Sequence, residues 1–155
     1  MTPSATTEQR LVIRAVTKAD FDQIVAVLDR WWGGPSPERA HPLFFHEFGD
    51  AALVAEDEGQ LVGFLLGLHT RSEPATGYIH LVGIHPDHRR RGVGHDLYQR
   101  FCENARAAGL QRVKAIAAVG HEGPIRFHLA QGFQGVEDPN YAGRGRARMV
   151  FIKDL

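Results

Sequence analysis

A short basic and glycine-rich stretch, GIHPDHRRRGVGHDLY at Gly83–Tyr98, has the clearest potential for chemistry in this sequence. Three arginines stand directly before Gly-Val-Gly, and the residues that follow have the apolar periodicity of a helix. A helix N-terminus presents unpaired N–H groups and a partial positive charge, and glycine lets the backbone approach an anion closely. The stretch therefore predicts a site for a phosphate or diphosphate.

Two other interpretations of this stretch stay open on the residues alone. A solvated turn is the simplest. A nucleic-acid site would need cations spread over a face with exposed aromatic residues, whereas these arginines share one turn and the formal net charge of the chain is zero. Two nucleotide-binding motifs are absent: the stretch lacks the Gly-Lys-Ser/Thr of a Walker loop, and Leu97 stands where the dinucleotide fingerprint needs its third glycine.

Histidines form the second group with potential for chemistry, because their ordinary pKa allows proton transfer near neutrality. The nine histidines show no HExxH or similar ligand spacing, so we expect no metal. Alternation along a strand predicts that His80 shares a face with Val82 and Ile84, unless a bulge shifts the parity. A strand histidine satisfied by a neighbouring backbone group is the alternative.

The elements that must position these residues follow from periodicity and turn signals. Strands are expected at residues 10–16, 51–56, 60–69, 77–85, 111–119, from 133 onward and at 146–155. Helices are expected at residues 17–32, 36–49, 92–107 and 123–132. The order β-α-α-β-β-β-α-β-α-β-β predicts an α/β fold of the α+β type, with a mixed sheet and a few crossing helices.

Length and composition set the remaining bounds. A chain of 155 residues predicts one domain, residues 10–155, after a disordered tail at residues 1–9. One cysteine, Cys102, cannot form an internal disulfide, and the first residues lack the apolar core of a secretory signal. No apolar run approaches the length of a membrane span. We therefore expect a cytoplasmic protein that binds neither membrane nor nucleic acid.

Two motifs resemble the GCN5-related N-acetyltransferase (GNAT) family. Arg89-Arg90-Arg91-Gly92-Val93-Gly94 fits its central signature, Arg/Gln-x-x-Gly-x-Gly/Ala, and IRFHLAQGF at Ile125–Phe133 is similar to its late helix, which ends in Gly-Phe. The resemblance extends over nearly the whole chain. It implies a GNAT-like fold with about six to seven strands, four helices and a splayed central strand pair. It also implies acetyl-CoA as the acetyl donor and direct transfer to a primary amine.

The resemblance implies where coenzyme A binds. The pantetheine arm would bond to backbone groups of Val82 and Ile84 in the gap between the splayed strands, and the amides from Arg90 to His95 would hold the pyrophosphate. The expected cofactor-binding residues are Val82, Gly83, Ile84, Arg89, Arg90, Arg91, Gly92, Val93, Gly94, His95, His121 and Phe127.

The catalytic residues depart from the family pattern. His128 stands at the usual tyrosine of the late helix, and His121 at the usual asparagine seven residues earlier. His128 is a candidate acid for the leaving thiolate; the alternatives are a hydrogen bond to the pantetheine or sulfur, or a half-buried helix histidine. His80 is the candidate base, and Glu47 and Asp50 are the second-choice candidates for that role. Tyr141 is a second candidate acid.

The acceptor is expected to be a small-molecule amine. Trp31, Trp32 and Phe45 would line its site as an apolar wall or a surface for a cation, and the alternative is that they pack the first helices onto the sheet. Two other functions stay open: a non-catalytic module that binds or senses acetyl-CoA, and acetylation of a protein or peptide amine. The family resemblance also allows a homodimer.

Overall fold

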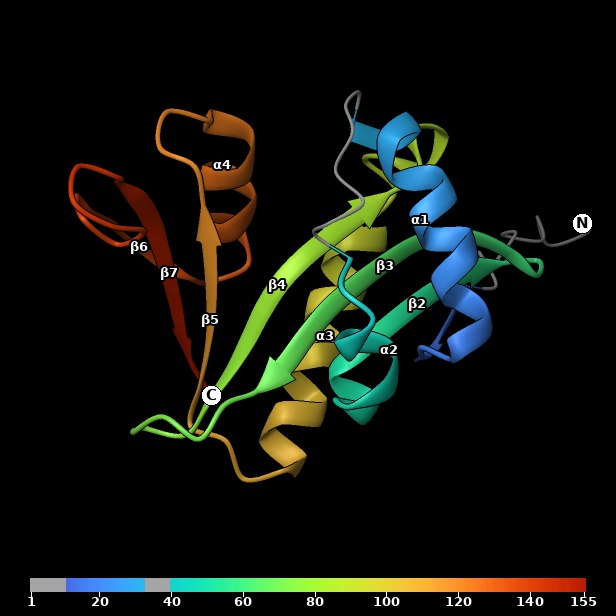
Figure 1. The fold of residues 1–155 in the computed structure, drawn as a ribbon, viewed down its shortest axis with the longest axis horizontal. Helices are drawn as coiled ribbons and strands as arrows, with labels where there is room; N and C mark the ends of the chain where they lie inside the picture. Colours follow the sequence, from blue (N-terminus) through green and yellow to red (C-terminus); the bar gives the residue numbers. More distant parts are fainter. Residues whose placement is uncertain (1–10, 33–39) are drawn as a thin grey trace, which may run out of the picture.

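A mixed sheet of seven strands, in the order β1-β2-β3-β4-β5-β7-β6, forms the centre of the molecule (Figure 1). The computed structural model describes residues 11–32 and 40–155, apart from the side chains of Asp29 and Trp32. The strands are β1 (Leu11–Ala15), β2 (Ala52–Asp57), β3 (Gln60–His69), β4 (Thr76–Ile84), β5 (Arg112–Ala117), β6 (Gln134–Asp138) and β7 (Arg148–Asp154).

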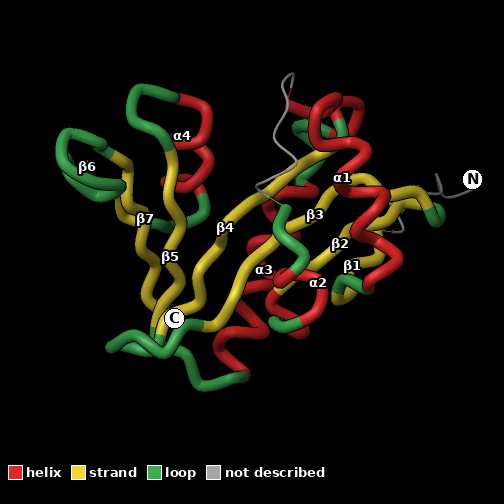
Figure 2. The backbone as a smooth tube through the Cα atoms, viewed as in Figure 1, coloured by secondary structure: helices red, strands yellow, loops and turns green. Residues whose placement is uncertain are grey.

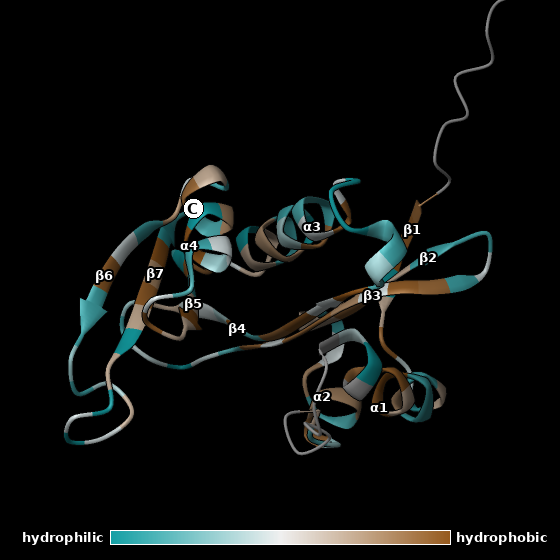
Figure 3. Ribbon diagram, turned by 90° about the horizontal axis from the view of Figure 1, so that it is seen from above, coloured by the Kyte–Doolittle hydropathy of each residue, from teal (hydrophilic) through white to brown (hydrophobic). Residues whose placement is uncertain are grey.

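The described part of the chain has four α-helices, which lie on the two faces of this sheet. Figure 3 shows α1 (Lys18–Trp32) and α2 (Leu43–His46) on one face of the N-terminal half, and α3 (Val93–Ala107) and α4 (Glu122–Ala130) on the other face. Short 3₁₀ turns, η2 (Gly49–Ala51) and η3 (Pro86–His88), join neighbouring elements. No helix of the described ranges is both long enough and apolar enough to cross a membrane.

Each face of the sheet has its own apolar core. The predicted stripe of α3, with Leu97 and Phe101 fully buried, packs on one face together with Leu65 of β3. Ile24 and Leu28 of α1 pack on the other face against residues that include Phe64, Leu66 and Leu81. Because β2 and β3 are covered on both faces, their sequences are nearly continuous apolar runs rather than alternating ones.

The junction of β4 and β5 is the only parallel pairing among the strands described. It joins Thr76–Ile79 to Arg112–Ala115 and then stops, although β4 continues to Ile84. Beyond this point the two strands diverge, as the tube in Figure 2 shows. The predicted mixed α/β sheet with a splayed central pair is therefore confirmed.

One polar network fastens α1 to the first two strands. The Arg14 guanidinium donates to both carboxylate oxygens of Asp20, at 2.8 and 2.9 Å, and to Glu56 at 2.6 Å. The Thr17 N–H also donates to Asp20, at 2.6 Å. The hydrogen bond from Arg14 lowers the pKa of Asp20 against the opposing effect of its burial. This network sets where α1 begins relative to the sheet.

The second predicted helix is wrong in extent. Its expected start at Ser36 lies outside the described residues, and within 40–49 only Leu43–His46 is α-helical. Gly49 has a φ of +54° and begins the η2 turn, which leads directly into β2. The other differences are small: β5 ends at Ala117 instead of 119, and β7 begins at Arg148 because the preceding residues form a glycine-rich loop.

Gly67→Ala should destabilise the protein by about 1–3 kcal/mol, because the core has no room for the added methyl group. A Cβ at Gly67 would lie 2.6 Å from the Phe101 ring and within 2.9 Å of the carbonyl oxygens of Tyr78 and Ala51. The measurement is the urea midpoint. Gly123→Ala is the matched control, because nothing lies within 4 Å of that position in α4. Equal midpoints for the two variants would contradict the packing described for β3.

Candidate active site

Backbone groups of β4 face the gap beyond the β4–β5 junction. The His85 N–H donates to the Val62 carbonyl at 2.8 Å, and hydrogen-bonded pairs alternate along an antiparallel ladder. The pair of Phe64 and Gly83 is therefore bonded within the sheet, whereas Val82 and Ile84 direct their N–H and C=O groups away from β3. Since β5 pairs with β4 only as far as Ile79, these groups face the gap.

The N-terminus of α3 lies next to the end of β4. Gly92 occupies the N-cap position with a φ of +81°, and no side chain of the described residues caps this helix. The first N–H to bond within the helix is that of Asp96, to the Gly92 carbonyl at 3.0 Å, so the amides before it point out of the helix. A Cβ at Gly94 would lie 3.3 Å from the Phe127 ring, which favours glycine there.

The three arginines before this turn have different roles. The Arg89 side chain donates to the Trp31 carbonyl and so ties the end of α1 to the turn. Arg90 has a φ of +65°, and both Arg90 and Arg91 are exposed. Among the described residues neither of these two forms an ion pair. The backbone amides, rather than a guanidinium cluster, are therefore the main feature of the predicted anion site.

His80 lies on the opposite face from Val82 and Ile84, so the predicted shared face is wrong. Leu81 pairs with Leu66 and Ile79 pairs with Gly67, which leaves His80 as the extra residue of a bulge. The bulge reverses the alternation: Val82 and Ile84 pack against the core under α3, as Ile79 does. His80 instead stacks on Phe44 of α2, with ring centroids 4.9 Å apart, and is exposed.

A cluster of side chains surrounds His80 on this face, and we call it the acceptor-side cluster: Phe44, Tyr78, His80, Lys114 and Tyr141. The rings of Tyr78 and His80 are 6.1 Å apart, and Tyr78 pairs with Lys114 across the β4–β5 junction. The Lys114 ammonium lies 4.8 Å from the centre of the Tyr141 ring. Burial, with a smaller contribution from Tyr141, raises the pKa of Tyr78.

The acceptor-side cluster contains residues that the sequence analysis missed. Phe44, Tyr78 and Lys114 were not among the predicted site residues. Tyr78 has the same strand parity as His80, which was an available signal. Lys114 had no comparable signal, because its proximity to Tyr141 depends on how the loop before β7 folds.

Comparison with known proteins matches this arrangement to one family. The sequence model of the acetyltransferase (GNAT) family matches residues 21–133, more than half of the chain. The chain belongs to the GNAT acetyltransferase family.

Relatives and solved structures agree with this assignment. An acetyltransferase of Sodalis glossinidius is 26% identical over 121 residues, which cover 75% of this chain and 82% of that protein. The L-methionine sulfoximine/L-methionine sulfone acetyltransferase of Salmonella typhimurium is 26% identical over 136 residues, 79% of this chain and 80% of that one. An acetyltransferase of Salmonella typhimurium, solved with its cofactor acetyl-CoA, has the same fold, with a TM-score of 0.70 at 22% identity and 94% of each chain covered.

His128 of this GNAT acetyltransferase is a core residue. Its Nδ1 lies 2.6 Å from the Pro124 carbonyl, which can only accept, so Nδ1 carries the proton and Nε2 accepts from the Tyr98 hydroxyl at 2.8 Å. The ring stacks on Phe151 with centroids 4.3 Å apart. Burial lowers the pKa of His128, so the ring is neutral at pH 7. This geometry supports the buried-histidine alternative and gives no support to the predicted acid.

The remaining predicted residues lie as follows. Trp31 is buried and stacks on Phe64 at 5.9 Å, and Phe45 is buried with its ring 4.9 Å from that of Phe21. Both belong to the core between the first helices and the sheet, and their contact with an acceptor stays a prediction. The Trp32 side chain lies outside the described residues. His121 is exposed at the N-cap of α4, without a side-chain cap bond.

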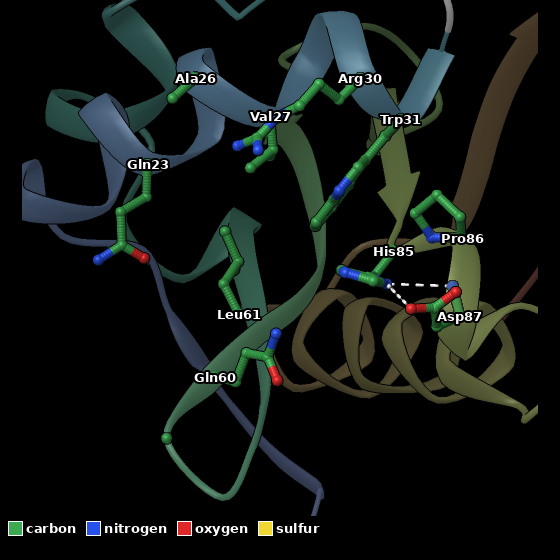
Figure 4. A pocket seen from close by; sticks show the side chains of 11 residues that line it. Gln23, Ala26, Val27, Arg30, Trp31, Gln60, Leu61, His85, Pro86 and Asp87 are labelled. Atoms are coloured by element: carbon green, nitrogen blue, oxygen red, sulfur yellow. Dashed lines mark hydrogen bonds and ion pairs between the residues drawn. The ribbon is translucent and has the colours of Figure 1, made fainter.

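Two cavities of the described structure lie away from the acceptor-side cluster. The larger, about 620 Å³, lies between α1, the β2–β3 turn and the turn after β4, where Arg30, Trp31 and His85 line it (Figure 4). The smaller, about 300 Å³, lies between α3 and α4 beside Cys102. In residues 11–32 and 40–155, no three His, Cys, Asp or Glu side chains gather as metal ligands.

The neutral, buried His128 should make stability depend on pH. Its folded pKa is below 6.5 and its unfolded pKa is near that value, so the unfolded chain binds the extra proton. The stabilisation is complete above about pH 6.5 and is lost as the pH falls towards the folded pKa. The urea midpoint is measured at pH 7.5 and at pH 5.5. Its fall between these two pH values should be larger for the wild type than for His128→Gln. The exposed His46→Gln is the control, and should match the wild type.

Proposed function

We propose that this GNAT acetyltransferase moves the acetyl group of acetyl-CoA directly to the primary amine of a small molecule. One observation carries the proposal: the uncapped N-terminus of α3 lies beside the end of β4, whose Val82 and Ile84 backbone groups face the gap beyond the β4–β5 junction. That combination suits a donor with a diphosphate at one end and a flexible amide-containing arm at the other. The related Salmonella structure, which holds acetyl-CoA, supports the same donor here.

The direction of the donor follows from this geometry. The diphosphate would accept from the amides of Val93, Gly94 and His95. The pantetheine arm would then bond to Val82 and Ile84 and run back along β4 towards the junction. His80 lies four positions before Ile84, which is about 13 Å of extended strand. The thioester would therefore lie at the narrow end of the gap, beside the acceptor-side cluster.

The bulge at His80 sets the roles in the transfer. The amine nitrogen attacks the thioester carbonyl carbon from the face that carries His80, and the C–S bond then breaks. His80, directly or through a water, takes the proton that the amine loses. Tyr141 is the proposed donor of the proton that the leaving thiolate gains, because both ring nitrogens of His128 are already occupied.

A small acceptor is supported by the relatives. The Salmonella relative that matches 79% of this chain is named for two amino-acid derivatives. A protein or peptide amine is the alternative acceptor, and a non-catalytic acetyl-CoA sensor is the alternative function. Thiol release from acetyl-CoA in the presence of an amine separates an enzyme from a sensor. Release with peptides but not with small amines would overturn the proposed acceptor class.

Gly92→Glu should weaken acetyl-CoA binding more than Gly92→Gln. Both variants place a side chain of similar size at a φ of +81°, where nothing lies within 4 Å, so backbone strain is matched. Only the glutamate puts a negative charge beside the proposed diphosphate. We expect a further loss of about tenfold or more in affinity, measured by calorimetry. Equal affinities of the two variants would place the diphosphate elsewhere.

His80→Ala should lower kcat/KM at pH 7 by about 100-fold or more, the usual contribution of a general base. The loss should shrink above pH 9, where the acceptor amine deprotonates without help. The assay is thiol release with a panel of small primary amines, which also tests the proposed function. His46→Ala, at the exposed end of α2, is the control. A loss that stays constant with pH would make His80 a positioning residue.

A further inference from the structure

Lys114 places a partly buried positive charge in the acceptor-side cluster. It lies at the third of the four paired positions of β4 and β5, opposite Tyr78. Its neighbours along β5, Val113 and Ala115, are buried in the core under α3, so alternation places Lys114 on the face of the acceptor-side cluster. The side chain is partly buried, and its ammonium lies over the Tyr141 ring.

Lys114 has no acidic partner within residues 11–32 and 40–155. The ion pairs of the described residues involve Arg14, His85, His88, Arg100, Arg112 and Arg126, but not Lys114. The Tyr141 ring stabilises an ammonium by a cation–π contact, yet no carboxylate of the described residues pairs with the N–H donors of Lys114. A partly buried cation of this kind favours an anion that arrives with a ligand.

The loop that covers Lys114 adds further positive charge. Residues 139–147, between β6 and β7, contain Arg144 and Arg146 and no acidic residue. The loop is held by its own hydrogen bonds, including Arg146 N–H to the Gly143 carbonyl at 2.9 Å and Gly145 N–H to the Asn140 side chain at 2.9 Å. These bonds hold Tyr141 in a turn over Lys114. The positive charge here is local, because the formal net charge of the whole chain is zero.

The distance between Lys114 and His80 fits one class of acceptor. Lys114 is directly opposite Tyr78, and His80 lies two residues further along β4. An interstrand spacing of about 4.8 Å and a rise of about 3.3 Å per residue place the two Cα atoms about 8 Å apart at the start of the gap. Both side chains project from the same face. An anionic group bound by Lys114 is consequently separated from an amine at His80 by only one or a few carbon atoms.

We infer that the acceptor is an amine with its own carboxylate close to the nitrogen, as in an amino acid, and that Lys114 binds this carboxylate. The inference rests on the proposed acetyltransferase function and specifies its substrate. Tyr78 and Phe44 form the apolar side of the site, while His80 receives the proton from the amine. Lys114 determines specificity and takes no part in bond making or breaking.

The test compares L-amino acids with their own amides as acceptors, in the thiol-release assay with acetyl-CoA. Each pair differs in the carboxylate, and the ratio of kcat/KM for acid over amide is measured for the wild type and for Lys114 variants. Dividing one ratio by the other cancels the different nucleophilicity of the two amines. The ratio should fall about 10- to 100-fold in Lys114→Gln, because a charge-assisted hydrogen bond is lost.

Three further variants sharpen the result. Lys114→Arg should keep most of the preference, and Lys114→Glu should reverse it towards amides. Lys18→Gln removes an exposed lysine at the start of α1 and should leave the ratio unchanged. The KM for acetyl-CoA should stay constant in every variant, whereas a disturbed β4–β5 junction would raise it.

Two outcomes would overturn the inference in distinguishable ways. If acids and amides are both acetylated and the ratio does not depend on Lys114, the acceptor class is wrong while the acetyltransferase function stands. If no small amine releases thiol, or only acidic peptides do, the proposed small-molecule function fails and the inference fails with it.

Discussion

Half of β4 has no hydrogen-bonded neighbour on its β5 side, and the rest of the site depends on this missing pairing. The two strands share only four paired positions, whereas every residue of β5 pairs with β7 on its other edge. Ile79 and Ala115, at the end of the junction, are buried in one core and hold the two halves of the sheet together. Backbone groups that face the gap need water or a ligand, because unpaired polar groups are costly to bury.

The bulge at His80 gives the two faces of β4 different tasks. Without it, His80 would point into the core under α3 together with Val82 and Ile84. With it, the backbone beyond the bulge faces the gap proposed for the donor, and the side chains at and before the bulge lie on the face proposed for the acceptor. The two reactants can then meet at the narrow end of the gap from opposite sides of one strand, with the acceptor approaching a face that α3 and α4 do not cover.

The late helix has a structural role at the position where the family resemblance implied an acid. His128 joins α4 to α3 through Tyr98 and to the sheet through Phe151. A neutral histidine with both nitrogens paired costs little to bury, but it has no free proton to give at pH 7. The proposed chemistry therefore lies on the other face of the sheet, where Tyr78, His80 and Tyr141 gather around Lys114.

The sequence by itself determined the local features. The position of the Gly92 turn, the α3 stripe, the order of strands and helices along the chain, and the GNAT resemblance all depend on residues that are close in the chain. The tertiary structure alone decided which side chains meet. The face of His80 depends on a bulge in the pairing with β3, the partner of His128 is 30 residues away, and Lys114 meets Tyr141 through a loop that joins different strands. Periodicity predicts the face of a residue only while the register is regular, and contacts between distant segments form only when the strands and helices pack.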